Sequence, residues 1–241
     1  MEILNTNQII ENLLYLPIDL PNPPTHELEI FKDIDVEKFW RDKFRTCWGV
    51  PLYTDHEEKG VYKWSPLGNK APELKAWIEE HILPMTGGTR ITFIVTPPGD
   101  KNAPHIDCSP EKFETIQHKF RFVMEGNVDD LVFLGKNDAR VRPPNLNNCF
   151  MMAGNWPHEM ENTHSGKKFT LAVGSPWEPD STDLNYSKLI SRSYDKFKDY
   201  YISKENMELV DNWREMFEDY KSSQHDICLL YTSDAADEVD G

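Results

Sequence analysis

Apolar residues recur at helical spacing near both ends of the chain. In the first part of the sequence this spacing predicts helices over residues 2–16, 35–44 and 72–83. In the last part it predicts two more helices, over 189–201 and 207–220. We expect these helices to pack against a central sheet, and the last two could instead form the contact surface of a homodimer.

Between these regions the pattern changes to short β-branched and aromatic runs separated by glycine, asparagine and proline. The expected strands are residues 89–96, 118–125, 130–135, 147–153, 157–162 and 167–174. Short strands without intervening helices predict a mainly β fold, an antiparallel sandwich or barrel such as the jelly roll of the cupins. The expected organisation is a helical support region (1–88), a β core (89–177), C-terminal helices (178–227) and a separate tail (228–241).

A histidine and a carboxylate lie two positions apart where the first expected strand leads into the core. In an extended chain, His105 and Asp107 point to the same side and Ile106 to the other. His158 follows 53 residues after His105 (158 − 105). Two imidazoles and one carboxylate on one side of a metal suit non-haem Fe(II) and leave coordination positions open.

Two other histidines compete with His158 for this role. His164 lies in a stretch that reads as a turn, where an imidazole is usually solvated. His118 is in step with Phe120 and Phe122 on an expected strand, and a histidine in an apolar row is more often packed than ligating. His158, which follows the strand-like 149–152 run, is therefore the favoured distal ligand.

A basic residue follows ten positions after His158 (168 − 158). If 167–174 is a strand, Lys168 and Thr170 share one face and Lys167 lies on the other. An inward Lys168 implies a nearby anion, because a buried lysine without a partner is costly. If both lysines lie at a solvated strand edge, they need no such partner.

This order of residues resembles the Fe(II)/2-oxoglutarate-dependent oxygenases, over residues 89–177. The distal block 154–162, followed by 167–171, resembles the aspartyl/asparaginyl β-hydroxylase branch of that superfamily. The resemblance implies a double-stranded β-helix in which His105, Asp107 and His158 hold Fe(II). It also implies that Lys168 and Thr170 bind the distal carboxylate of 2-oxoglutarate, and that O2 is used to hydroxylate an unactivated C–H with release of succinate and CO2.

Arg121 and Trp156 are candidates for contact with a carboxylate of the substrate or of 2-oxoglutarate. The planar fork of Arg121 can hold a carboxylate through two parallel hydrogen bonds. The side chain of Arg121 points into the site only if the apolar face of its strand packs outward. Otherwise Arg121 lies on the surface. With Trp156, it suits an amino-acid, peptide or other small carboxylate-bearing substrate.

Bulk properties narrow the class of protein. A net charge of −15 and a pI of about 4.9 disfavour nucleic acid as the main partner. Neither a membrane span nor a secretory signal is recognisable, and the four cysteines show no paired spacing, so we expect a cytoplasmic protein with reduced thiols. Residues from 228 onward resemble a translated sequencing adaptor and are expected to be non-native.

Two other functions fit the same ligand pattern. A cupin-type metal enzyme, such as an isomerase or a thiol dioxygenase, would use the three ligands without 2-oxoglutarate and would not need Lys168. A non-catalytic domain would bind the metal for stability and consume no cosubstrate.

Overall fold

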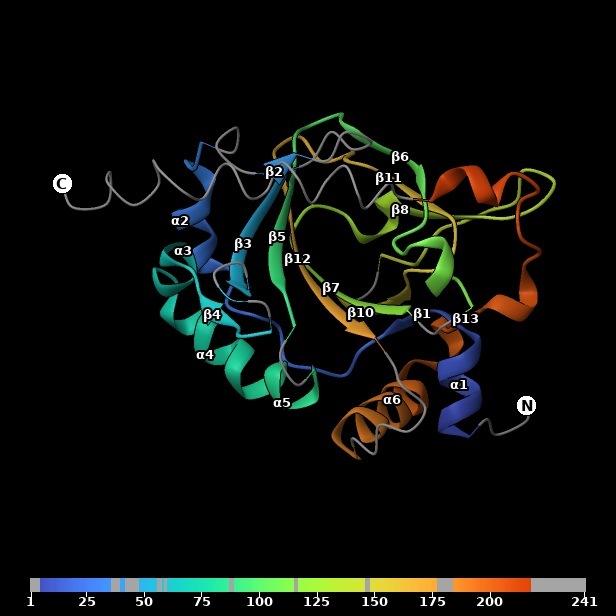
Figure 1. The fold of residues 1–241 in the computed structure, drawn as a ribbon, viewed down its shortest axis with the longest axis horizontal. Helices are drawn as coiled ribbons and strands as arrows, with labels where there is room; N and C mark the ends of the chain where they lie inside the picture. Colours follow the sequence, from blue (N-terminus) through green and yellow to red (C-terminus); the bar gives the residue numbers. More distant parts are fainter. Residues whose placement is uncertain are drawn as a thin grey trace.

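Two antiparallel β-sheets face each other in the computed structural model (Figure 1). The structure describes residues 5–35, 40–41, 48–55, 58, 60–86, 89–114, 117–145, 148–176 and 184–217. The larger sheet has nine strands and the smaller sheet four.

The larger sheet contains strands from both the beginning and the end of the described sequence. Its strands, in spatial order, are β13 (Ile202–Ser203), β1 (Leu13–Pro17), β10 (Cys149–Ala153), β7 (Gln117–Glu125), β12 (Lys168–Pro176), β5 (Ile91–Thr96), β3 (Trp48–Thr54) and β2 (Trp40–Arg41), with β4 (Lys63–Trp64) paired to β3. The strands of the smaller sheet are β6 (Lys101–His105), β11 (His158–Glu161), β8 (Leu131–Leu134) and β9 (Arg140–Val141).

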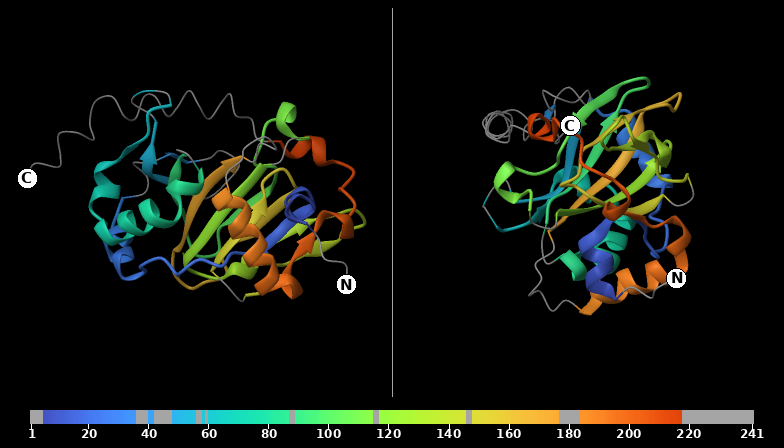
Figure 2. Two further views of the ribbon diagram at one scale, coloured as in Figure 1. Left: turned by 90° about the horizontal axis from the view of Figure 1, so that it is seen from below. Right: turned by 90° about the vertical axis from the view of Figure 1, so that its right-hand side faces the viewer.

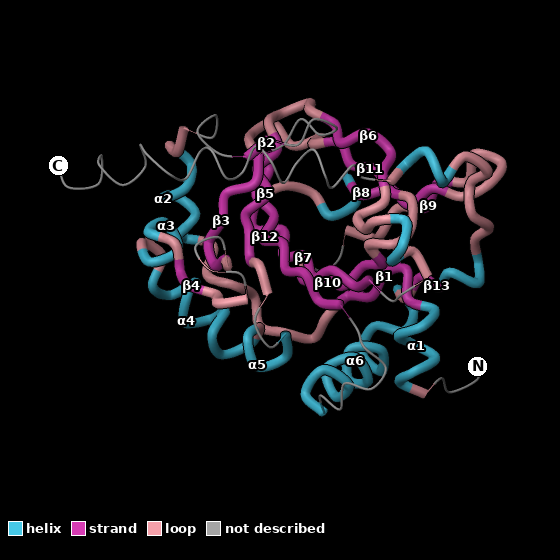
Figure 3. The backbone as a smooth tube through the Cα atoms, viewed as in Figure 1, coloured by secondary structure: helices cyan, strands magenta, loops and turns pink. Residues whose placement is uncertain are grey.

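Helices lie outside this pair of sheets (Figures 2 and 3). The α-helices are α1 (Thr6–Asn12), α2 (Glu29–Lys32), α3 (Pro66–Asn69), α4 (Pro72–His81), α5 (Leu83–Thr86) and α6 (Leu184–Phe197). The 3-10 turns are η1 (His26–Leu28), η3 (Pro110–Lys112), η4 (Val128–Asp130), η5 (Lys198–Tyr200), η6 (Lys204–Asn206) and η7 (Trp213–Met216). Within the described ranges, every helix is too short or too polar to cross a bilayer.

The outer face of the larger sheet forms the main hydrophobic core with the helices. Side chains alternate along β7 and β12, so Phe120 and Phe122 of β7 and Leu171 of β12 point toward the helices. Apolar residues of α1, α4 and α6 cover them, including Ile10, Ile78 and Ile190. Removal of this apolar surface from water is the main stabilisation of the helical layer.

A second, smaller core fills the space between the two sheets. Val123, Phe150 and Met152 come from the larger sheet, and Leu131 and Phe133 from the smaller one. This arrangement is a mainly β double-stranded β-helix, or jelly roll, with flanking N-terminal and C-terminal helices, as the strand pattern and the resemblance predicted.

The six expected strands and the helix beginning at Pro72 are present, but the ends of the chain differ from expectation. The first helix ends at Asn12, and the fully buried run Leu13–Pro17 continues as β1, paired with β10. With β3, this strand extends the larger sheet beyond residues 89–177. Most of the helix expected over 35–44 falls outside the described residues, and Trp40–Arg41 is a strand.

The helix expected over 207–220 does not form in its described part. Residues 207–212 are irregular, and only the short turn η7 follows, while residues from 218, including the adaptor-like tail, lie outside the described residues. This segment is bonded instead to residues that follow β8 and β6, because the amides of Lys136 and Ile106 donate to Glu208 O and Met216 O. By contrast, α6 forms where expected and packs against the larger sheet through Leu189 and Ile190.

We expect His118 to make the fold sensitive to acid. Its imidazole is fully buried beside the Tyr186 hydroxyl (Nδ1 to Oη, 3.1 Å), and burial lowers its pKa to about 3. The unfolded chain takes up this proton below about pH 6.5, and the folded chain does so only near pH 3. As the pH is lowered between these two values, the free energy of unfolding therefore falls by up to about 1.4 kcal/mol per pH unit. Urea unfolding at a series of pH values should show a shallower acid limb for His118→Phe than for the wild type. Parallel pH curves would contradict this.

Candidate metal centre and adjoining pocket

Strand pairing in the smaller sheet brings the two candidate histidine ligands together. His105 is the last residue of β6 and His158 the first of β11, and the two are directly opposite each other in the antiparallel register. Their ring centroids are 4.3 Å apart. Two residues separated by 53 positions in the sequence thus become cross-strand neighbours, as the family resemblance implied.

Asp107 reaches the same point from the segment that follows β6. Its backbone amide donates to Gly154 O at 2.7 Å, and the preceding Ile106 amide donates to Met216 O at 2.8 Å. These bonds tie the segment to the turn before His158 and to the C-terminal segment. They keep the carboxylate on the side that the two imidazoles occupy.

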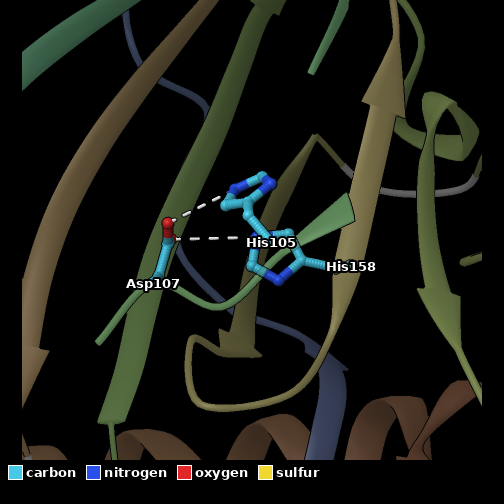
Figure 4. Close-up of side chains that lie close together, drawn as sticks. All are labelled: His105, Asp107 and His158. Atoms are coloured by element: carbon cyan, nitrogen blue, oxygen red, sulfur yellow. Dashed lines mark ion pairs between the residues drawn. The ribbon is translucent and has the colours of Figure 1, made fainter. Parts of the chain in front are cut away.

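The three side chains form a compact, buried group (Figure 4). Asp107 Oδ1 lies 3.4 Å from His105 Nε2, and Asp107 Oδ2 lies 3.8 Å from His158 Nε2. One ligand atom from each residue falls within 4.8 Å of the others, and all three residues are at most 5 % exposed. Metal bonds of about 2.1 Å at right angles would place neighbouring donor atoms ~3 Å apart, somewhat closer together than these separations.

Backbone carbonyls orient both imidazoles. His105 Nδ1 lies 2.7 Å from Ala103 O, and His158 Nδ1 lies 2.8 Å from Trp156 O. A carbonyl oxygen only accepts hydrogen bonds, so Nδ1 of each ring is the donor, and Nε2, on the side of Asp107, is the nitrogen that a metal could bind. This is the outer-shell arrangement usual for metal-binding histidines, and the donor set therefore fits a divalent transition metal.

A pocket between the two sheets adjoins this group. Apolar side chains from both sheets, such as Val123, Leu131 and Phe150, make up much of its lining. The charged side chains in the described part of the lining are Asp107, Arg121 and Lys168, of which Asp107 belongs to the metal group. The pocket is thus largely apolar with a few polar groups, as small-molecule sites usually are.

Arg121 lines this pocket and contacts the carboxylate of the metal group. The apolar face of β7 packs outward against the helices, so the structure selects the inward orientation of Arg121 from the two alternatives. Its Nη2 donates to Asp107 Oδ2 at 3.1 Å, and its Nη1 donates to Phe120 O at 3.1 Å. By holding one carboxylate oxygen, Arg121 fixes the direction in which the other, Oδ1, points toward His105.

Lys168 is also inside the pocket, with Thr170 on the same face of β12. The anion that a buried lysine requires is supplied by the protein: Lys168 Nζ lies 2.7 Å from Asp130 Oδ2 and also donates to Asn127 O. Lysine and aspartate are 2 % and 1 % exposed. Burial lowers the pKa of Lys168, and the Asp130 carboxylate opposes that shift.

A glycine makes room for the stem of this lysine. Gly126 has φ +113°, and a Cβ placed on it would lie 2.6 Å from Lys168 Cγ. Only glycine readily combines this backbone conformation with such a close approach. Lys167 points elsewhere, since its Nζ donates to Lys32 O and it does not line the pocket.

The remaining sequence candidates lie away from the pocket lining. Trp156 is buried in the core between the sheets, and its indole Nε1 donates to Leu134 O at 2.9 Å, so its N–H is already bonded. Its contribution to the site is the carbonyl that orients His158. His164 accepts from the Gly166 amide within a turn, and His118 packs on the outer face of the larger sheet.

Three polar residues in or next to the pocket lining were not singled out from the sequence: Asn102, Asp130 and Thr163. Asn102 Oδ1 and Thr170 Oγ1 are buried without a hydrogen-bond partner among the residues that the structure describes, and both residues line the pocket. Orphaned buried polar atoms cost free energy unless a ligand or water bonds to them. Of these two, only Thr170 was expected. Asn102 and Thr163 lie outside the expected strands and Asp130 begins one of them (130–135), so the pattern did not mark any of the three as a site residue.

Comparisons with known proteins found similarity at the level of structure only. No protein-family model matches the sequence, and no curated protein matches it. Among solved structures, a prolyl-4-hydroxylase from Pseudomonas putida aligns with TM-score 0.43 and 10% identity, covering 72% of this chain and 99% of that one. A prolyl hydroxylase from Trichoplax adhaerens, in complex with a hypoxia-inducible-factor peptide fragment, aligns with TM-score 0.45 and 10% identity, covering 71% and 88%.

A third similar structure is HygX from Streptomyces hygroscopicus with nickel and 2-oxoglutarate bound. It aligns with TM-score 0.41 and 11% identity, covering 76% of this chain and 94% of that one. At TM-scores and identities this low, the similarities carry no functional argument. The function of this chain must be inferred from its own site.

Proposed function

We propose that this protein is an Fe(II)/2-oxoglutarate-dependent dioxygenase that hydroxylates a C–H bond. The observation that carries the proposal is the buried group of His105, Asp107 and His158, whose two imidazoles present Nε2 to one carboxylate beside a pocket. Two neutral nitrogen donors and one carboxylate leave open positions on Fe(II), which oxygenases of this kind require.

In this proposal the three side chains hold the iron. With 2-oxoglutarate and O2, the iron would supply the oxidising power for hydroxylation, and 2-oxoglutarate would be converted to succinate and CO2. The chain supplies orientation and a dry site. Arg121 holds Asp107 Oδ2, and the carbonyls of Ala103 and Trp156 hold the imidazoles. The apolar lining excludes water from the reacting atoms.

Lys168 and Thr170 are proposed to bind the distal carboxylate of 2-oxoglutarate. Lys168 uses two of its three N–H groups on Asp130 and Asn127, which leaves one for a ligand in the pocket that it lines. The orphaned Thr170 hydroxyl lies two residues along the same strand face. Together they offer a carboxylate one charged and one neutral donor.

The charges around the pocket are consistent with this pair of ligands. Arg121 is matched by Asp107 and Lys168 by Asp130, so these four groups sum to zero. The charges of a divalent metal and of a dianionic cosubstrate also cancel. Binding both together would therefore leave the buried site without net charge.

The substrate is proposed to be an amino acid, a peptide or another small molecule that bears a carboxylate. Arg121 supports this because its guanidinium reaches the pocket from β7 and is rich in donors. The indole of Trp156 is bonded to Leu134 O, so we do not include it in substrate binding. Membership of the aspartyl/asparaginyl β-hydroxylase branch and a cytoplasmic location remain predictions from the sequence.

Turnover of 2-oxoglutarate distinguishes this function from its two rivals. With Fe(II), ascorbate and air, the purified protein should convert 2-oxoglutarate to succinate, and the rate should rise when the right carboxylate-bearing compound is added. A cupin-type enzyme or a metal-stabilised binding domain would bind Fe(II) but release no succinate. Metal binding without any succinate, across a screen of amino acids and peptides, would refute the proposal.

A further inference from the structure

Asp130 is the centre of a closed hydrogen-bond network behind Lys168. Its Oδ2 accepts from Lys168 Nζ at 2.7 Å, and its Oδ1 accepts from Thr163 Oγ1 at 2.5 Å and from the Thr163 amide at 3.3 Å. The Asn127 side chain donates to Thr163 Oγ1 at 2.9 Å, and the Asn127 carbonyl accepts from Lys168. The carboxylate, which η4 carries, is thus bonded both by β12 and by the turn that follows β11.

This network lies on the side of Lys168 that faces away from the pocket. Lys168 and Thr170 line the pocket, whereas Asp130, Thr163 and Asn127 do not. The ammonium is therefore held from behind, and its stem is confined by Gly126. A ligand in the pocket can meet the ammonium without displacing Asp130.

Few other charges act on this lysine. Asp129, next to Asp130 in η4, acts on it more weakly than Asp130 does. The neighbouring strand β5 places the neutral Thr96 opposite it, and across the pocket lie Arg121 and the metal group. Asp130 is thus the charged group in contact with Lys168 among the described residues.

We infer that Asp130 is a positioning residue that keeps Lys168 protonated and aimed at the pocket, so that the protein binds the distal carboxylate of 2-oxoglutarate with little dependence on pH. This inference rests on the proposed function. A lysine buried without a counter-ion would lose its proton near neutral pH and would have to recover it each time a carboxylate bound. With Asp130 in place, the charge is present before the ligand arrives.

The test compares Asp130→Asn with Asp129→Asn, a matched control that removes the same charge one residue away. Binding of 2-oxoglutarate to protein preloaded with Mn(II) is measured by calorimetry without oxygen from pH 7 to 9. For the wild type and for Asp129→Asn, the affinity for 2-oxoglutarate should change less than about twofold over this range. For Asp130→Asn it should fall about tenfold per pH unit above the pKa that Lys168 has in that variant. A purely structural ion pair would lower stability without changing this pH profile.

Proton uptake by the wild type gives a second test that does not depend on whether the variant folds. Titrations at pH 8.5 in two buffers with different ionisation heats should show almost no proton uptake when 2-oxoglutarate binds. Uptake of about one proton, or a pH profile of Asp130→Asn that matches the control, would overturn the role of Asp130 and leave the proposed function standing. If wild-type protein with Mn(II) does not bind 2-oxoglutarate at any pH, the proposed function itself fails.

Discussion

Replacing His158 with alanine is expected to abolish succinate release and to weaken Fe(II) binding by about a hundredfold or more. The imidazole supplies one of three donor atoms, and no other histidine among the described residues lies close enough to replace it. Disturbing even the outer shell of a metal site typically costs about 10–100-fold in affinity, so losing a ligand should cost at least that much. Anaerobic calorimetry with Fe(II) or Mn(II) measures the effect.

His164→Ala is the matched control for this substitution. His164 lies six residues further along (164 − 158), in a turn, and its Nδ1 accepts from the nearby Gly166 amide. It should retain wild-type metal affinity and succinate release. If the two variants lost metal binding equally, or if His158→Ala kept it, the assigned ligand set would be refuted.

Replacing Lys168 with methionine is expected to remove 2-oxoglutarate binding while leaving Fe(II) binding intact. It should also destabilise the fold by about 3–5 kcal/mol, because the buried Asp130 carboxylate would lose its cationic partner. Calorimetry with 2-oxoglutarate on the Mn(II)-loaded protein measures the first effect, and urea unfolding measures the second. Lys167→Met, whose lysine points away from the pocket, is the matched control and should bind 2-oxoglutarate normally.

A double variant separates lost binding from lost stability. Lys168→Met combined with Asp130→Leu replaces the whole ion pair by apolar side chains, which is often neutral or stabilising. Its stability should return part of the way to that of the wild type, because Thr163 still loses its acceptor, but 2-oxoglutarate should still not bind. Recovery of 2-oxoglutarate binding together with stability would show that Lys168 is a structural residue and that another group holds the distal carboxylate.

The central part of the fold was predictable because side-chain alternation in a strand is a local property. The pattern of residues 118–125 and 167–174 predicted which residues share a face, and the structure places Lys168 and Thr170 together on the pocket side. The convergence of His105 and His158 required in addition that β6 and β11 pair in register. Sequence pattern alone does not fix that pairing, and here the family resemblance supplied it.

The parts that were not predictable depend on partners distant in sequence. The expected anion beside Lys168 is Asp130, 38 residues earlier, which the sequence placed at the start of the expected strand 130–135 and which lies instead at the end of η4. The C-terminal segment 207–217 has helical spacing, but backbone bonds to Ile106 and Lys136 hold it in an irregular path. In both cases tertiary hydrogen bonds outweigh the local preference.

The central claim is that two imidazoles and one carboxylate hold a single Fe(II) beside a 2-oxoglutarate site. An anaerobic spectroscopic titration tests it most directly. Fe(II) and then 2-oxoglutarate are added to the wild-type protein while the visible spectrum is recorded. A weak charge-transfer band should appear only when both are present, should saturate at one equivalent of each, and should be missing from Asp107→Ala and His158→Ala. Absence of the band from the wild type, or its persistence in those variants, would contradict the account.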